Sequence, residues 1–147
     1  MNEKRVLDEL RAAFDRLDPV PEDVLAAGRS ALSWREPSAD LAELTDESGR
    51  ELAGARSANE LRLLTFRAPG HTVEIEISGS GGDLAMTGRL APATVADVRL
   101  RHPRAVELFA RADERGRFVL TDVPAGLVSL VFRLPDASCV VTSWILL

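Results

Sequence analysis

The chain has 147 residues, of which 46% are hydrophobic and 28% charged, with a formal net charge of −5 at pH 7. A chain of this length folds as one domain, or as one domain with an appendage. The acidic balance disfavours nucleic acid as a partner, because attraction to phosphate dominates that kind of binding. The single cysteine, Cys139, excludes an intramolecular disulfide and a multi-cysteine zinc site.

The sequence also predicts where the protein is located. No stretch approaches ~18 consecutive apolar residues, so we expect no membrane span. The charged start, Met1–Arg5, is not followed by the apolar core of a signal peptide. These two features predict a cytoplasmic protein.

Residues 1–42 are predicted to be a helical N-terminal segment. A first helix is expected from about Glu3 to Leu17, because apolar residues recur there at helical spacing. This apolar stripe consists of Val6, Leu7, Leu10, Ala13, Phe14 and Leu17. A second helix is expected from Pro21, which suits a first helical position, to about Trp34. Ser38 is expected to cap one further turn through Leu41.

Residues 43–147 are predicted to be a β-sandwich domain. They contain 20 β-branched residues, whereas residues 1–42 contain three. Period-2 runs with turns between them predict strands over residues 61–66, 72–77, 84–90, 95–101, 105–111, 117–121, 127–134 and 139–146. The expected fold class is therefore α+β, with two or three N-terminal helices followed by an antiparallel sandwich of seven or eight strands.

Two resemblances add to this interpretation. Gly116-Arg117-Phe118, the turn Val123–Gly126 and the alternating strand after it resemble carboxypeptidase regulatory-like modules. Those modules are transthyretin-like β-sandwiches, and the resemblance covers about residues 84–134, including Gly88-Arg89-Leu90. It implies a non-catalytic accessory or binding module. The whole chain is also similar to small actinobacterial proteins of unassigned function, some encoded beside extracytoplasmic-function sigma factors.

The candidate catalytic and metal-binding residues do not form a pattern that predicts catalysis. His71 and His102 each lie beside a proline or glycine turn, and Cys139 lies in an apolar strand pattern. No residue pattern predicts a metal site or a nucleophile with its base, so we expect no enzyme activity, no cofactor and no metal. The glycine-rich run Gly79–Gly82 is followed by Asp83, which predicts a hairpin loop and not a phosphate site.

Charge distribution predicts a protein partner. Residues 1–50 contain 12 acidic and 7 basic side chains, whereas the remainder is neutral overall. An acidic segment suits a partner with a basic surface, and the second resemblance implies a sigma factor or another operon product. The predicted partner-binding residues on the helices are Val24, Leu25, Leu32 and Trp34.

Other interpretations stay open at this point. The helices could instead pack on the β domain or on each other, and a homo-oligomer is possible. An alternative function is a module that binds a small ligand or peptide with loops at one end of the sandwich. The loops expected to carry such a site are residues 79–83, 102–105 and 113–116.

Overall fold

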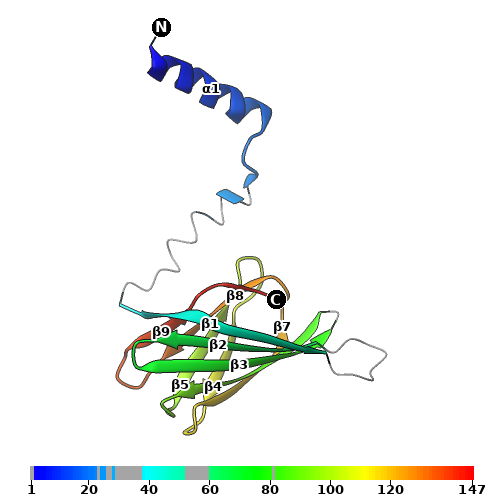
Figure 1. Cartoon of the computed structure of the whole chain (residues 1–147), viewed down its shortest axis with the longest axis vertical. Coiled ribbons are helices and arrows are strands. Elements are labelled where there is room, and N and C mark those ends of the chain that lie inside the picture. The colour runs from blue at the N-terminus through cyan, green and yellow to red at the C-terminus, as the bar shows by residue number, and fades with distance from the viewer. Residues whose placement is uncertain (1, 23, 26–27, 29–37, 52–59, 81) are drawn as a thin grey trace. The chain divides into compact units, whose positions relative to one another are not determined.

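The computed structural model describes residues 2–22, 24–25, 28, 38–51, 60–80 and 82–147. The chain divides into two compact units, Met1–Arg35 and Glu36–Leu147 (Figure 1). Within the described residues, the first unit contains helix α1 and the second contains ten strands. No helix in this part of the chain is long and apolar enough to cross a membrane.

Helix α1 spans Glu3–Leu17, and the predicted first helix is confirmed. Glu3 lies in its first turn and Arg16 in its last turn, where each charge complements the helix dipole. Arg5 and Glu9 form an ion pair one turn apart, with 3.3 Å between Nε and Oε1. None of the helix residues is buried.

The predicted second helix, from Pro21 to about Trp34, lies largely outside the described residues. After Pro21, the described residues of this stretch have helical backbone: Glu22, Val24, Leu25 and Gly28. The further helical turn predicted through Leu41 is wrong, because the chain enters strand β1 at Asp40. There Asp40–Ala42 pairs in parallel with Val140–Thr142, and Ala42 is fully buried.

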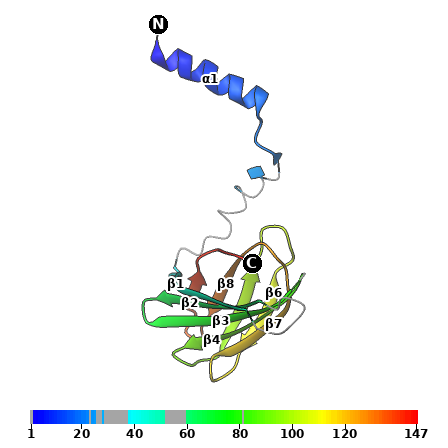
Figure 2. The ribbon, with the colours of Figure 1, turned by 45° about the vertical axis from the view of Figure 1, so that its right-hand side comes forward.

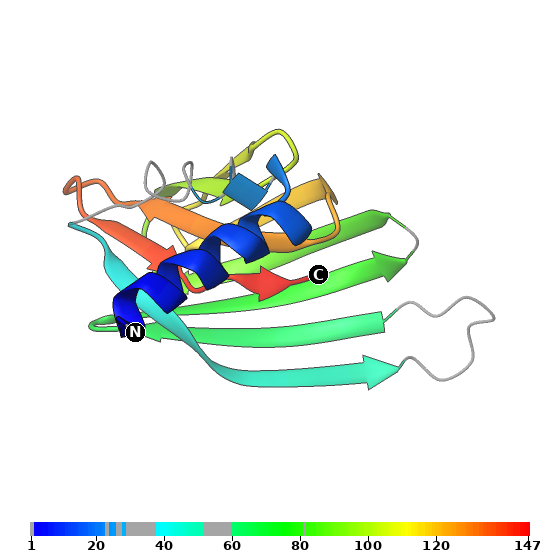
Figure 3. The same cartoon turned by 90° about the horizontal axis from the view of Figure 1, so that it is seen from above.

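The second unit is built from strands alone. Their bounds are β1 Asp40–Glu51, β2 Glu60–Ala68, β3 His71–Ser80, β4 Asp83–Ala91, β5 Ala96–Arg101, β6 Leu108–Ala112, β7 Arg117–Val123, β8 Leu127–Arg133, β9 Cys139–Thr142 and β10 Ile145–Leu146. The order across the sheet is β6-β5-β8-β9-β1-β2-β3-β4-β7, and β10 pairs with β8. The long strands β1 to β4, cyan to green in Figure 3, lie side by side.

The predicted fold of two or three helices and a β-sandwich is wrong. The described strands form one continuous sheet, which curls until its end strands β6 and β7 lie close together in a nearly closed barrel (Figure 2). Strand β1 makes the sheet continuous, because it pairs with β2 on one side and with β9 on the other. Short strands with alternating side chains are typical of both sandwiches and barrels, so spacing alone does not separate them.

The hydrophobic core lies inside the barrel. Phe118 and Leu120 on β7, and Leu130 and Phe132 on β8, are at most 3% exposed. The rings of Phe118 and Phe132 pack edge to face, with centroids 5.3 Å apart. Gly88 on β4 lies opposite Phe118, and a Cβ at Gly88 would lie only 2.2 Å from Cζ of that ring. The glycine therefore makes room for an aromatic side chain in the core.

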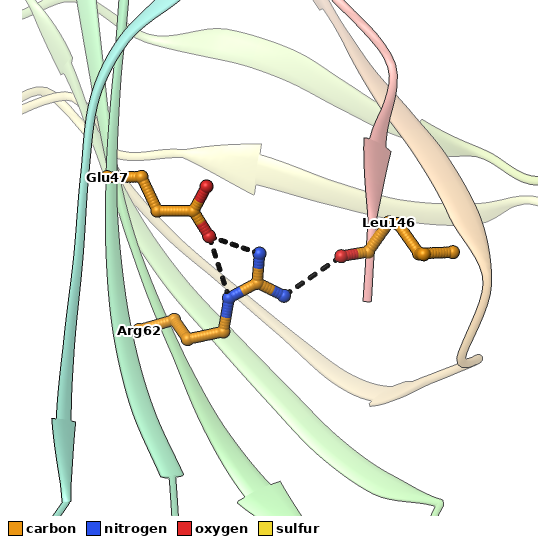
Figure 4. A network of polar contacts seen from close by, with 3 residues as sticks. All are labelled: Glu47, Arg62 and Leu146. Carbon is orange, nitrogen blue, oxygen red and sulfur yellow. Dashed lines mark hydrogen bonds and ion pairs between the residues drawn. The ribbon is translucent and has the colours of Figure 1, made fainter.

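A polar network joins β1 and β2 to the C-terminal strand (Figure 4). The Arg62 guanidinium on β2 donates through Nε to Oε1 of Glu47 at 3.1 Å. Its Nη1 donates to the carbonyl oxygen of Leu146 on β10 at 2.9 Å. Leu147 also exchanges two backbone hydrogen bonds with Gly126. Together these bonds hold the C-terminal residues against the barrel.

Candidate interaction surfaces

The apolar stripe of α1 is the first candidate interaction surface. Leu7, Phe14 and Leu17 are 64%, 66% and 84% exposed, and Val6 and Leu10 are also exposed. At about 100° per residue, the six stripe residues cover an arc of roughly 120° on one side of the helix. A stripe of this width is typical of a helix that packs against other elements.

The width and length of the stripe indicate what kind of surface it fits. A two-stranded coiled coil uses a narrower seam repeated over several heptads. Helix α1 has 15 residues, which corresponds to a length of about 22 Å. A short helix with a wide apolar stripe fits a groove better than it fits an identical helix.

The net negative charge predicted for the helical segment does not lie on α1. This helix contains four acidic and four basic side chains. The acidic excess of residues 1–50 therefore comes from the part of the chain after Leu17. A basic partner would be attracted to that later segment, whereas α1 itself offers an apolar stripe between mixed charges.

Two of the predicted partner-binding residues can be placed. Val24 is 50% exposed and Leu25 is 41% exposed. Leu32 and Trp34 lie outside the described residues. Among the described residues of the first unit, most of the exposed large apolar side chains lie on α1, which precedes the residues singled out from the sequence.

A hollow of ≈ 340 Å³ lies on the outer face of β5, β6 and β8. It is lined by Asp97, Val98, Arg99, Phe109, Ala110, Val131 and Arg133. Val131 is 3% exposed although it does not belong to the core cluster, and Phe109 is 72% exposed. This hollow therefore combines an apolar floor, an aromatic side chain and charged groups.

A second hollow, of ≈ 530 Å³, lies on the outer face of β1 to β4 and β7. Its charged lining consists of Asp46, Glu74, Glu76, Arg89 and Arg117. Glu74 and Arg89 form an exposed ion pair with 3.2 Å between Oε2 and Nη2, a contact worth about 0–1 kcal/mol. The mixture of charges on this open face does not single out one kind of ligand.

The two histidines lie next to turns: His71 is the first residue of β3, and His102 follows the last residue of β5. His102 Nε2 lies 2.8 Å from the carbonyl oxygen of Ala125, and Nδ1 accepts from the backbone N–H of Arg104 at 2.9 Å. His102 thereby fastens the β5–β6 loop to the β7–β8 turn. Nδ1 of His71 is buried and has no hydrogen-bond partner among the described residues.

His71, Asp136 and Ser138 are residue types found in serine hydrolases, but they do not form a catalytic relay here. The Ser138 hydroxyl donates to Oδ1 of Asp136 at 2.6 Å, and the Ser138 backbone N–H donates to the same oxygen. These bonds hold the pKa of Asp136 below its ordinary value, and the charge of His71 contributes less. A nucleophilic serine would donate to histidine, so this cluster is a turn motif.

In the β6–β7 turn, Asp113 stabilises the turn by accepting hydrogen bonds from the backbone. Oδ1 of Asp113 accepts from the backbone N–H of Arg117 and of Arg115, each at 2.9 Å. The bond from Arg117, followed by that from Arg115, holds the pKa of Asp113 below its ordinary value. Within the described residues, no group of three or more His, Cys, Asp or Glu side chains could hold a metal ion.

The three loops predicted to carry a ligand site do not gather at one end. Loop 79–83 lies near the β7–β8 turn because Leu84, which follows the loop, pairs with Val123 at the end of β7. Loop 102–105 lies near the same turn because His102 contacts the carbonyl oxygen of Ala125. Loop 113–116 lies at the opposite end, where the carbonyl oxygen of Gly116 accepts from the N–H of Leu90. The loop arrangement expected for that alternative function is therefore absent among these three loops.

The comparisons with known proteins find no relative. No family model, no curated protein and no solved structure matches the chain. The resemblances to carboxypeptidase regulatory-like modules and to small actinobacterial proteins therefore stay predictions.

Sequence reasoning identified the α1 stripe but missed the hollow on β5, β6 and β8. The outward positions of these strands were visible in the period-2 pattern, including Asp97, Arg99 and Arg133. What the sequence did not contain is the strand order, which places β5 between β6 and β8. Only that order brings Phe109 and Val131 to the same hollow.

Proposed function

We propose that this chain is a non-enzymatic protein-interaction or regulatory protein, in which α1 docks through its apolar stripe into a groove on a protein partner. The observation that carries the proposal is that α1 is amphipathic and none of its residues is buried. Apolar side chains on a helix gain free energy when a partner removes them from water. The spacing of the stripe is that of helix-in-groove ligands.

The partner is proposed to have an apolar groove with a basic surface beside it. The acidic residues after α1 support the basic surface, because opposite charges accelerate association. Val24, Leu25, Leu32 and Trp34 would extend the interface beyond the groove. A sigma factor or another product of the same operon is the candidate that the predicted resemblance supplies.

A quantitative pull-down with the full-length chain tests this proposal. The stripe variant replaces Leu7, Leu10 and Phe14 by alanine, which keeps helix propensity and removes the apolar surface. A matched control variant replaces Asp8, Glu9 and Arg16 on the polar face by alanine. We expect the stripe variant, and not the control, to lose specific partners identified by mass spectrometry. Equal recovery by both variants would contradict the proposal.

Self-association is tested in the same preparations. Light scattering of the purified wild-type chain should show a monomer, because the short wide stripe does not suit a two-stranded coiled coil. A dimer that the stripe variant converts to a monomer would show that a second copy covers the stripe. Circular dichroism of the variants confirms that α1 remains helical.

A further inference from the structure

Part of the hollow on β5, β6 and β8 is lined by apolar side chains. Val131 forms its floor and is 3% exposed, although its neighbours Leu130 and Phe132 point to the barrel interior. Phe109 projects from β6 on the same outer face and is 72% exposed. At ≈ 340 Å³ the hollow is near the lower end of ligand sites, about 300–1,000 Å³, and suits a single residue.

Two opposite charges line this hollow on neighbouring strands. Asp97 on β5 and Arg133 on β8 are directly opposite in the antiparallel ladder, and both side chains are exposed. Opposed charges in neighbouring strands usually pair. Here neither side chain makes an ion pair or hydrogen bond with any residue that the structure describes. The Asp97 carboxylate and the Arg133 guanidinium can therefore form hydrogen bonds with a ligand in this hollow.

The charges around the hollow favour a ligand that carries a carboxylate. Arg111 lies opposite Asp97 on its other side, so Asp97 has an arginine on both neighbouring strands. Arg99 has its own partner, Glu107, at 4.0 Å. With Arg111 included, this part of the outer face has three arginines against Asp97 and Glu107, a net charge of +1, which complements an anion.

We propose that Asp97, Phe109, Val131 and Arg133, the terminal-residue site, bind the carboxyl-terminal residue of a peptide whose last side chain is apolar. The α-carboxylate accepts two hydrogen bonds from the Arg133 guanidinium, a geometry that suits this pair. The N–H of the same residue donates to Asp97. The apolar side chain lies on Val131 beside the Phe109 ring.

This site is independent of the proposed docking of α1. A free apolar amino acid presents the same carboxylate and side chain, with an ammonium group in place of the peptide N–H. We assign the chain terminus because the hollow is open on the outer face of the sheet, where a longer chain can continue away from it. The experiment compares both sources directly.

The test is a ¹H–¹⁵N NMR titration of the full-length chain with the peptide acetyl-Ala-Ala-Leu. We expect saturable shifts of amides in β5, β6 and β8 around Asp97, Phe109 and Val131. The same peptide with a carboxamide end should bind at least about tenfold more weakly, because it lacks the charge that pairs with arginine. Arg133→Gln should weaken binding by a similar factor, and Phe109→Ala by several-fold.

Matched variants on other parts of the outer face serve as controls. Arg67→Gln removes an exposed arginine of β2, and Val119→Ala shortens an exposed apolar side chain of β7. Both should bind the peptide as the wild type does, and so should the α1 stripe variant. Absence of saturable shifts, shifts elsewhere on the barrel, or equal binding of acid and carboxamide would overturn the site. Tighter binding of free leucine than of the peptide would overturn the chain-terminus assignment.

Discussion

Replacing Gly88 by alanine is expected to destabilise the barrel by about 2 kcal/mol. The new Cβ would lie 2.2 Å from Cζ and 2.6 Å from Cε1 of Phe118, whereas carbon atoms in contact lie about 3.5–4.0 Å apart. Phe118 is 2% exposed and packs on Phe132, so its ring cannot move aside freely. Overpacking of this kind costs about 1–3 kcal/mol. The upper end applies here, and the lower entropy of unfolded alanine offsets about 0.4–1 kcal/mol of it.

The assay is urea unfolding followed by far-UV circular dichroism, with thermal unfolding as a second readout. For a unit of this size, a loss of about 2 kcal/mol lowers Tm by roughly 8 °C. Phe118→Leu should be destabilising alone but should relieve the clash, so the double variant should lose at least about 1 kcal/mol less than the sum of the single changes. Gly28→Ala is the control, since a Cβ there meets no atom within 4 Å. Unfolding free energies within about 0.5 kcal/mol of wild type for Gly88→Ala, or additive losses in the double variant, would refute the reasoning.

Three further changes have defined outcomes. Asp113→Asn should lower Tm at neutral pH and should make Tm depend less on pH in acid, as measured by thermal unfolding. The reason is that the pKa of Asp113 is lowered in the folded state, so its contribution to stability is complete above about pH 4 and is lost as pH falls through the folded-state pKa. Arg62→Met should lower the unfolding free energy in urea by about 1 kcal/mol, whereas Arg67→Met changes it by less than about 0.5 kcal/mol. Leu10→Ala should leave the thermal unfolding of the barrel unchanged, because α1 buries no side chain.

Local pattern was enough to predict the interior of the barrel. The hairpin of β2 and β3 turns between Ala68 and His71, where proline and glycine signal it. Along β3, Val73, Ile75 and Ile77 are buried while Glu74 and Glu76 are exposed, as strict alternation predicts. These features depend on neighbours in the chain, and sequence periodicity records them directly.

Strand β1 could not be predicted in the same way. Its residues 40–51 include one β-branched side chain, Thr45, and are rich in Glu, Asp and Leu. Such a composition does not favour a strand by propensity. The segment is extended because it pairs with β2 and β9, and this tertiary context overrides the local preference. The closure of the sheet depends on the same pairs and was therefore also missed.

The basic residues of β5 show a related limit. By strict alternation along the strand, Arg101 is expected to project outward into solvent, as Arg99 does. Arg101 is instead 3% exposed, and its guanidinium lies 5.3 Å from the ring centroid of Trp144. Nη2 of Arg101 also donates to Oγ of Ser129 at 3.0 Å. These partners are distant in sequence, so the period of the strand could not identify them. The same holds for the pair Asp97 and Arg133.

The measurement that tests the central claim most directly is hydrogen–deuterium exchange of the full-length chain, alone and with the partner recovered in the pull-down. Our account predicts that binding slows exchange of the α1 amides, residues 3–17, because docking into a groove protects a helix that otherwise buries no side chain. Unchanged exchange in α1, with slowing confined to the barrel strands, would contradict the claim that α1 is the docking element.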